Sequence, residues 1–410
     1  MVESSYDLVI VGGGIGGSAL ATVMQRAGCS CLVLERTTEF PDRTKGEWIA
    51  PWGVGEVHRL DLLDIVASAR GHVLHRHVIY DEVMDPAAAE EGALSLALLP
   101  GIDGPMTQRH PDLCQALLDA ALVRGAEVVR GVDHVGVTLD PEPTVTFAVD
   151  GSSRTARARL IVGADGRNSV VRRELGFGLE KDAPHHLFSG LLVDNADDWP
   201  EDTQIAGAEG DIHFLAFPQG KGRVRLYLGL GLEQRHRLSG HDGPTEFVKA
   251  FHLQCVPNSG ALAEATPISP CATYPNEDSW VDVPVVDGAV LIGDAGGWND
   301  PITGQGLSIT LRDARLVSEI LQASDDWSAA AFGQYVEERR ECLRRLRFSA
   351  QLQSALFNEF GEEARERRLR ALGRFGENPD LMLSLLAVMV GPENVDASYF
   401  TEDARERILA

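Results

Sequence analysis

Three glycines near the start of the chain have the spacing of a dinucleotide-binding turn. Gly12, Gly14 and Gly17 directly follow the apolar run 7–11, and an acidic residue, Glu35, stands about 20 residues further on. The first glycine permits a tight turn, the second lets a pyrophosphate approach the backbone, and the third lets a helix pack closely on a strand. A carboxylate at position 35 accepts hydrogen bonds from a ribose. The pattern predicts a bound dinucleotide and does not separate NAD from FAD.

A second motif lies in residues 161–172, which read Ile-Val-Gly-Ala-Asp-Gly-Arg-Asn-Ser-Val-Val-Arg. Asp165 and Gly166 stand directly after the apolar part of this stretch, where a buried strand is expected to end. The spacing from this Asp-Gly pair to the later serine and arginine marks a second signature, far from the first in sequence.

A third motif combines a carboxylate with bare backbone. Asp294 follows the apolar run 290–292 and can accept a hydrogen bond from a polyol hydroxyl. Gly304, Gln305 and Gly306 come next and open a helix, so backbone N–H groups and the positive end of a helix face one place. Such donors stabilise a site where negative charge develops. A reduced flavin develops charge of this kind at its N1–C2=O edge.

These motifs require strands and helices in a particular order. Residues 7–11, 15–27 and 31–34 predict a strand, a helix and a second strand, which form one βαβ unit. Further predicted elements are a helix at 111–124, apolar strands at 127–130, 160–164 and 290–292, and an antiparallel insert at 135–139, 144–149 and 154–159. The nucleotide-binding half is therefore assembled from discontinuous segments.

A sheet-rich module is expected to supply the substrate side. Its predicted elements are strands at 189–193, 212–217 and 223–230 and a helix near 245–255, followed by helices from 306 to the end. Alternation places His213, Leu215 and Phe217 on one strand face, and Arg225 shares a face with Tyr227. His213 is a candidate base, and Arg225 and Tyr227 are candidate catalytic or substrate contacts. The alternative for each is an ordinary satisfied or solvated strand residue.

Composition narrows the range of partners. The 410 residues contain 37 Lys and Arg against 61 Asp and Glu, a formal charge of −24 that repels phosphate backbones and anionic head groups. The six cysteines form no C-x-x-C pair or metal-ligand spacing, and the N-terminus shows no secretory signal, so we expect a reduced, cytoplasmic protein without a metal site. The apolar stretch 381–390 is too short to span a bilayer and predicts a buried helix. Neither nucleic acid nor membrane is an expected partner.

In their order and separation, the three motifs resemble those of the class A flavoprotein monooxygenases with the p-hydroxybenzoate hydroxylase-type fold, over about residues 5–320. The resemblance implies FAD, with the pyrophosphate at the glycine-rich turn and the adenosine ribose at Glu35 and Arg36. It places the ribityl chain at Asp294. It implies that the isoalloxazine ring lies at the segment made of Gly304, Gln305, Gly306 and Leu307.

Other segments resemble further parts of that family. Lys45, where the family more often has arginine, and Arg109 are implied to touch FAD. Asp165 and Gly166 are implied to serve both FAD and the co-substrate NADH or NADPH. Pro301 stands closest by motif to the point of oxygen transfer.

The fold class implied is α/β, with three parts. These are a Rossmann-like FAD-binding domain from residues 1–75, 101–186 and 276–325, a β-sheet-rich substrate domain from 76–100 and 187–275, and a C-terminal helical region from 326–410. No second dinucleotide fingerprint is present, which is consistent with a family that binds its nicotinamide without a separate domain.

The activity implied is an NAD(P)H-consuming monooxygenase that uses O₂ and a flavin C4a-hydroperoxide to hydroxylate or epoxidise a small molecule. An electron-rich aromatic, polyketide or alkaloid-like substrate is expected. One departure loosens the link to aromatic hydroxylation, since many members have histidine where this chain has Gly297. The alternatives are a flavin-dependent halogenase, whose Trp-x-Trp-x-Ile-Pro segment is absent from the sequence, a reductase on the same scaffold, and a non-catalytic flavin-binding protein.

Overall fold

The first half of the molecule is built on a sheet whose central strands are parallel. The computed structural model describes residues 3–42, 44 and 46–410. Strand order in this sheet is β20-β21-β11-β1-β2-β8, with β9 and β10 beside β11. The parallel strands are β1 (Glu3–Val11), β2 (Cys31–Glu35), β8 (Glu127–Arg130), β11 (Ser152–Gly163) and β21 (Ala289–Leu291), and the antiparallel ones are β9 (His134–Thr138), β10 (Thr144–Val149) and β20 (Val285–Val286).

Helices cover one face of this sheet. They are α1 (Ile15–Arg26), α5 (His110–Val123) and α9 (Gly306–Ala323), with the short α2 (Pro51–Arg59) and α3 (Leu63–Ser68) beside them. Along β1, Leu8 and Ile10 pack against these helices, while Val9 and Val11 face the antiparallel strands and α6 (Val170–Glu174). Strands buried on both faces are expected to read as continuous apolar runs. The predicted βαβ unit is confirmed.

One predicted boundary is wrong. Residues 154–159 and 160–164 were expected as two strands, but β11 runs without a break from Ser152 to Gly163. Its first three residues are exposed, residues 156–159 alternate between buried and exposed, and its last four residues are buried. Residues 155–163 of β11 pair continuously with β1, from Glu3 to Val11, so no turn interrupts the strand. The change in burial instead marks the point where pairing with β10 ends.

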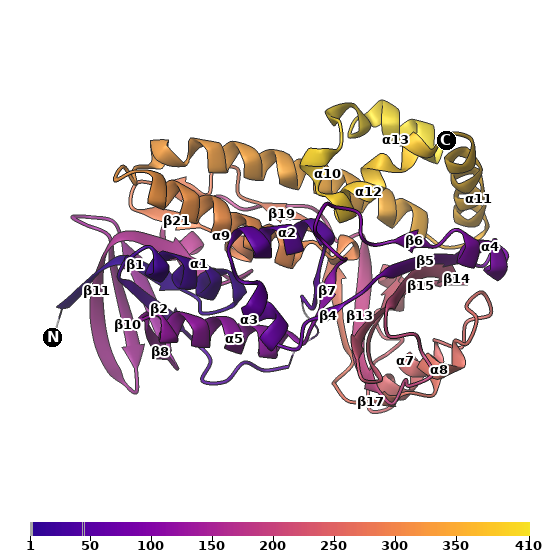
Figure 1. Cartoon of the computed structure of the whole chain (residues 1–410), viewed down its shortest axis with the longest axis horizontal. Helices are drawn as coiled ribbons and strands as arrows, with labels where there is room; N and C mark the ends of the chain where they lie inside the picture. The colour runs from indigo at the N-terminus through magenta and orange to yellow at the C-terminus, as the bar shows by residue number, and fades with distance from the viewer. Residues whose placement is uncertain (1–2, 43, 45) are drawn as a thin grey trace.

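A second sheet makes up the other half (Figure 1). Its strands are β5 (Arg76–Asp81), β6 (Leu94–Ser95), β13 (His186–Asp194), β14 (Thr203–Glu209), β15 (Ile212–Gly220), β16 (Arg223–Leu230), β17 (Thr266–Pro267) and β18 (Ala272–Asn276). The helices α7 (Gly243–Lys249) and α8 (Gly260–Ala263) pack on one face through buried residues such as Phe247 and Leu262. The predicted helix 245–255 is thus shorter than expected, because the chain turns after Lys249. The opposite face carries aromatic side chains toward the first half.

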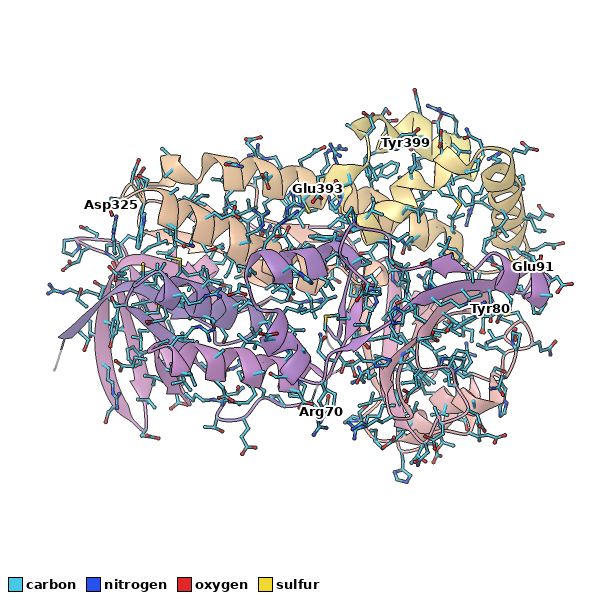
Figure 2. All side chains as sticks on the ribbon, in the orientation of Figure 1. Arg70, Tyr80, Glu91, Asp325, Glu393 and Tyr399 are labelled. Atoms are coloured by element: carbon cyan, nitrogen blue, oxygen red, sulfur yellow. The ribbon has the colours of Figure 1, made fainter. Side chains whose placement is uncertain are left out.

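The remaining α-helices are one short helix after β5 and four helices near the C-terminus. They are α4 (Pro86–Glu91), α10 (Gly333–Phe357), α11 (Glu362–Glu377), α12 (Leu383–Val390) and α13 (Glu402–Leu409). In Figure 1, α10 runs along the top of the molecule from the first sheet to the C-terminal helices. In Figure 2, Asp325, after α9, is labelled at the left end of this layer, and Tyr399 is labelled among the C-terminal helices at the top right. The helix predicted at 381–390 is present as α12 but is only half-buried.

Small strands connect the halves. β7 (Met106–Thr107) pairs with β3 (Trp48–Ile49) and with β4 (His72–Val73), and β12 (Glu180–Lys181) pairs with β19 (Ser279–Trp280). In the part of the chain that the structure describes, no helix combines the length and hydropathy needed to cross a bilayer.

Candidate functional site

The glycine-rich turn connects β1 to α1 and leaves the start of that helix open. Gly12 has φ +107°, and a Cβ there would lie 2.3 Å from the Ala164 carbonyl oxygen. A Cβ at Gly17 would lie 2.0 Å from the carbonyl oxygen of Gly12. A Cβ at Gly14 would instead meet nothing within 4 Å, and no side chain caps α1 among the described residues. Two glycines therefore permit close packing, and the third borders open space at a helix N-terminus.

Glu35 lies beside this turn, at the end of β2. One carboxylate oxygen accepts from the backbone N–H of Gly13 at 2.9 Å, and the other accepts from the backbone N–H of Thr37 at 2.8 Å. These two bonds fix the carboxylate next to the first turn of α1. The neighbouring Arg36 side chain is exposed.

The Asp-Gly signature forms a second turn against the first. Asp165 Oδ2 accepts from the backbone N–H of Val170 at 2.6 Å and so caps α6, while its buried Oδ1 has no partner among the described atoms. Burial raises the pKa of the Asp165 carboxyl. Gly166 has φ +76°, with open space where its Cβ would lie. Arg172, also in this signature, donates to the Ala295 carbonyl at 2.8 Å and thereby joins the second motif to the third.

The third motif is held from behind by two residues that the sequence did not single out. Its first part is the 3₁₀ turn η2 (Gly293–Gly296). Asp313 on α9 accepts from the backbone N–H of Gly293 at 2.8 Å and from Nε of Arg339 on α10 at 3.0 Å. Arg339 also donates to the carbonyls of Gly293, Gly296 and Gly297 at 2.9, 3.0 and 3.2 Å. Both side chains are buried, so the turn that carries Asp294 is supported by a buried ion pair.

Asp294 itself is half-exposed, with its Oδ2 3.4 Å from Nε of Arg167. The turn η3 (Pro301–Thr303) follows, and Gly304 then adopts φ +67°. Gln305 is buried, with its Oε1 accepting from the Trp52 indole at 2.8 Å.

The N-terminus of α9 is also open. A Cβ at Gly306 would meet nothing within 4 Å, and no described side chain caps this helix. Leu307 is buried next to Gly46, whose Cβ position lies 3.0 Å from the leucine methyl. A Cβ at Gly16 would lie 2.7 Å from the Thr310 methyl, so the first turns of α1 and α9 are neighbours. Two uncapped helix N-termini therefore open close together at the carboxyl ends of parallel strands.

This arrangement fits FAD. Open space at Gly14, Gly166 and Gly306 gives backbone access to an elongated ligand, and both helix ends suit negative charge. The buried Oδ1 of Asp165, which has no partner among the described atoms, is a polar atom that a bound polar ligand can satisfy. Gly14 and Glu35 would hold the diphosphate and ribose, and Asp294 with Gly306 would hold the ribityl chain and ring.

Next to this site, an ion-pair cluster joins the two halves. Arg109, at the start of α5, donates to Asp42 at 2.8 Å, and Asp42 lies 3.8 Å from Arg225 of β16. Arg225 is buried and forms a two-pronged ion pair with Glu47, one contact being 2.8 Å. Arg225 thus ties the second sheet to the segment before β3 and is not a free cation. Lys45 lies outside the described residues.

Burial raises the pKa of the Glu47 carboxyl from 4.5 to about 7, although the Arg225 guanidinium opposes this change. Because Glu47 binds its proton more tightly in the folded chain than in the unfolded one, its contribution to stability is complete below pH 4.5. It is lost as pH rises through about 7.

We therefore predict that the free energy of unfolding of the wild type, relative to that of Glu47→Gln, falls by about 3 kcal/mol between pH 4.5 and 7.5. Glutamine does not titrate but resembles protonated glutamate in shape. Chemical unfolding of both proteins across this range measures the difference. Parallel pH curves for the two proteins would refute the predicted titration.

The second sheet presents an aromatic face to residues 301–307, the segment proposed to carry the flavin ring and here called the flavin-site segment. The ring of Tyr227 lies between two phenylalanines. Its centroid is 6.1 Å from the centroid of Phe188 and 6.1 Å from that of Phe217. Phe188 belongs to one apolar cluster with Ile302, which directly follows Pro301. Tyr227 and Tyr274 are half-buried on the same sheet and belong to the same apolar cluster. This aromatic face therefore lies against the η3 turn.

His213 lies on the same face of β15 as Phe217, where the end of α10 covers it. The predicted alternation is present, but the ring is buried, stacked on Phe357 at 5.6 Å and next to Phe188 at 6.0 Å. Burial lowers its pKa to about 3, so the imidazole is neutral and accepts protons weakly at physiological pH. The structure therefore argues against His213 as the base.

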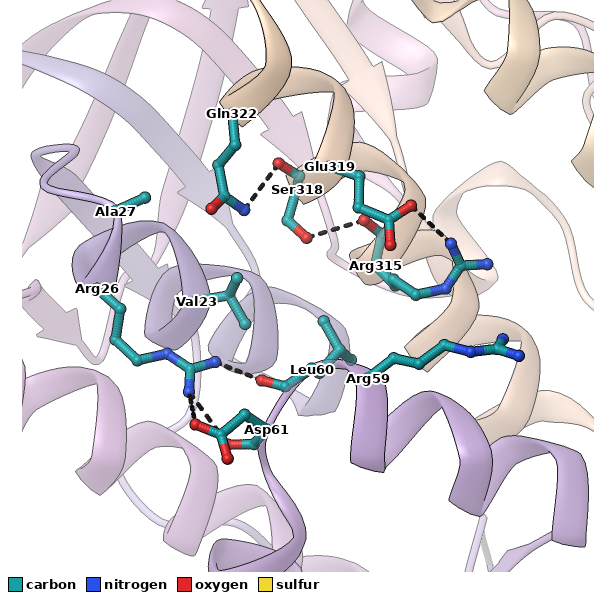
Figure 3. Close-up of a pocket in the computed structure, with 10 residues that line it drawn as sticks. All are labelled: Val23, Arg26, Ala27, Arg59, Leu60, Asp61, Arg315, Ser318, Glu319 and Gln322. Atoms are coloured by element: carbon teal, nitrogen blue, oxygen red, sulfur yellow. Dashed lines mark hydrogen bonds and ion pairs between the residues drawn. The ribbon is translucent and has the colours of Figure 1, made fainter. Parts of the chain in front are cut away.

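A separate surface hollow lies on the far side of α1, between that helix and the ends of α2 and α9 (Figure 3). Its arginines are already paired: Arg26 with Asp61 at 2.5 Å, Arg59 with Glu56 at 2.9 Å, and Arg315 with Glu319 at 2.7 Å. These pairs neutralise its walls, and it shares no residue with the flavin site.

Known proteins similar to this chain are flavoenzymes. The FAD binding domain family matches residues 5–347. Squalene monooxygenase of Rattus norvegicus is 25% identical over 335 residues, covering 78% of this chain but 55% of that protein, so the chain spans about half the length of this relative. 3-Hydroxybenzoate 6-hydroxylase of Klebsiella oxytoca is 26% identical over 381 residues, covering 89% of this chain and 92% of that protein.

The fold has a close counterpart among solved structures. The crystal structure of pqsL, a probable FAD-dependent monooxygenase from Pseudomonas aeruginosa, superposes with a TM-score of 0.74 at 22% identity. It covers 91% of this chain and 100% of that one. At this level of identity the likeness establishes the fold.

Proposed function

Because the chain belongs to the class A flavoprotein monooxygenase family, with FAD as its cofactor, we propose that it hydroxylates or epoxidises an electron-rich aromatic or polyketide-like small molecule with NADH or NADPH and O₂. The observation that carries the proposal is the aromatic face of the second sheet, which meets the η3 turn at Ile302. Flat side chains at this place suit a flat, apolar substrate held over the flavin-site segment.

The residues of the aromatic face bind and orient the substrate and exclude water. Phe188 and Phe217 supply apolar walls, and Tyr227 and Tyr274 add hydroxyl groups to them. Burial raises the pKa of Tyr274 to about 12 and raises that of Tyr227 as well. Both phenols therefore keep their protons near neutral pH and can donate hydrogen bonds to a substrate oxygen.

The backbone at the start of α9 stabilises negative charge. No described side chain caps this helix, so the N–H groups of Gly306 and Leu307 lie open at the positive end of an 18-residue helix. Bound at this place, FAD would supply the redox chemistry, namely hydride acceptance from NADH or NADPH and transfer of one atom of O₂ to the substrate. The overall reaction converts substrate, NAD(P)H, H⁺ and O₂ into oxygenated substrate, NAD(P)⁺ and H₂O. The apolar side chains of the aromatic face limit wasteful reaction with water.

The proposal is tested by following NADH and NADPH oxidation by the FAD-loaded protein with a panel of phenols, aminobenzoates, polyketide aromatics and polyprenyl olefins. We expect an aromatic compound to stimulate oxidation and to gain one oxygen atom from ¹⁸O₂, detected by mass spectrometry. Stimulation only by olefins would replace the aromatic substrate class with an apolar polyprenyl one.

Two other results would reject the monooxygenase reaction. A product that contains chlorine or bromine when halide is supplied would assign a halogenase. A yellow protein that oxidises neither nicotinamide with any compound would leave a non-catalytic flavin-binding protein.

A further inference from the structure

The buried arginine of the aromatic face is already neutralised by the chain itself. Arg225 is 1% exposed and stands directly opposite Phe217 in the pairing of β16 with β15, two residues before Tyr227. It therefore projects from the same face of the sheet as those two rings. Its ion-pair partner Glu47 is 4% exposed. The buried positive charge that this face could offer to a substrate is thus paired inside the protein.

The ion pair also lies close to the flavin-site segment. Trp48, the residue after Glu47, packs on the Phe217 ring with the two centroids 6.1 Å apart. A Cβ at Gly304 would lie 2.9 Å from the same indole ring. A molecule held where the aromatic face meets the flavin-site segment is therefore close to Glu47 and Arg225.

Other arginines near this place are paired as well. Arg167 is near enough to Tyr274 to oppose the rise that burial causes in the pKa of that phenol. Three arginines near the aromatic face or its edge each contact a carboxylate: Arg225 with Glu47 at 2.8 Å, Arg109 with Asp42 at 2.8 Å and Asp112 at 3.7 Å, and Arg167 with Asp294 at 3.4 Å. These three guanidinium groups therefore hold no free charge for an anionic substituent.

A buried amide beside the ion pair lacks a partner. Gln108 is 1% exposed, and its backbone N–H donates to the Glu47 carbonyl at 3.0 Å. Neither the Nε2 nor the Oε1 of its side chain has a hydrogen-bond partner among the described atoms. Because an unpaired buried amide is costly, Gln108 points to a ligand group that both donates and accepts hydrogen bonds.

We propose that the polar corner formed by Glu47, Arg225 and Gln108 selects aromatic substrates with a neutral polar substituent, a hydroxyl or a carboxamide, over aromatic carboxylates. A carboxylate brought here would lose its water, meet the Glu47 carboxylate and gain no free cation. A hydroxyl or carboxamide can accept from the Gln108 amide and donate to its oxygen or to Glu47. This inference rests on the proposed aromatic substrate and narrows its class.

Ligand pairs that differ only in this charge test the proposal. They are 3-hydroxybenzamide with 3-hydroxybenzoate, 2-aminobenzamide with 2-aminobenzoate, and 1-hydroxy-2-naphthamide with 1-hydroxy-2-naphthoate. Their dissociation constants are measured from the flavin absorption of the FAD-loaded protein at pH 8, where Glu47, whose pKa burial raises to about 7, carries its charge. We expect each amide to bind at least about 10-fold more tightly than its acid.

The outcomes separate this inference from the proposed function. Equal or tighter binding of the acids would overturn the selection of a neutral group and leave the aromatic substrate in place. Failure of every pair to bind a protein that turns over another aromatic compound would overturn it as well. Absence of binding and of stimulated nicotinamide oxidation with every aromatic compound would reject the proposed function itself.

Removing the charge of Glu47 should reverse the preference. Glu47→Gln keeps the shape of the side chain but leaves Arg225 without its carboxylate, so the acids should gain at least about 10-fold in affinity and the amides should change less than about 3-fold. The matched control is Glu56→Gln on α2, since Glu56 is also buried and paired with an arginine, Arg315. It should keep the wild-type preference. An unchanged preference in Glu47→Gln would refute the role of the ion pair.

Gln108→Leu gives an independent measurement. Because the amide has no partner in the free protein, leucine should not lower the midpoint of chemical unfolding, whereas it should weaken binding of the amides about 10-fold. A lower midpoint with unchanged amide affinity would give Gln108 a structural role and contradict the proposal. If Glu47→Gln does not fold, this variant and the wild-type preference still decide the question.

Discussion

Replacing Gly14 with valine is expected to abolish FAD binding while the fold persists. Gly14 has φ −72° and ψ −166°, an extended conformation that valine adopts readily, and its Cβ position faces open space. The added methyl groups would stand at the N-terminus of α1, where the diphosphate must approach the backbone. We expect at least about a 100-fold loss of affinity, or about 2.7 kcal/mol, by flavin titration of the apo protein.

Gly55→Val is the matched control for this change. Gly55 lies on α2, and its Cβ position also meets nothing within 4 Å, so the substitution adds the same atoms away from the site. It should keep wild-type FAD affinity. A fully flavinated Gly14→Val protein would show that the glycine-rich turn does not hold the diphosphate.

Replacing Arg339 with methionine should have the largest effect on stability. The change removes the charged partner of buried Asp313 and leaves the carbonyls of Gly293, Gly296 and Gly297 without their donor. Breaking one side of a buried pair destabilises by about 3–5 kcal/mol. Chemical unfolding should show this loss, and FAD affinity should fall with it because the turn that carries Asp294 loses its support.

The neighbouring residue on the same helix is the control. Arg340 is about half exposed and pairs with Glu337 at 2.9 Å, so Arg340→Met should change stability by about 0.5 kcal/mol or less. Adding Asp313→Asn to Arg339→Met should restore part of the lost stability, because no unpaired buried charge remains. Equal stability of Arg339→Met and Arg340→Met would contradict the assigned support.

The residues that could be predicted from sequence are those whose signal is local. The spacing of Gly12, Gly14 and Gly17 predicts a strand, a turn and a helix within a short stretch. Each glycine is needed at a position of that turn where a Cβ would block the backbone, the ligand or the helix packing. Alternation along β15 likewise revealed which face His213 occupies. These patterns depend on neighbours a few positions away, and such neighbours are visible in a single sequence.

The residues that could not be predicted form ion pairs with partners far away in the sequence. Asp313 and Arg339 lie on different helices, and neither spacing nor residue type marks them as partners. The same holds for Glu47 with Arg225, a pair that joins segments more than 100 residues apart. Arg225 and His213 have the residue types of a site, but only packing reveals that one is paired and the other enclosed.

The central claim is that two separated stretches of backbone, the turn before α1 and the turn before α9, together bind one FAD. Its most direct test is the visible absorption spectrum of the purified wild-type chain after incubation with FAD and removal of the excess. We predict a yellow protein with the bands of oxidised flavin and one FAD per chain. A colourless protein that retains no flavin while remaining folded would contradict the account.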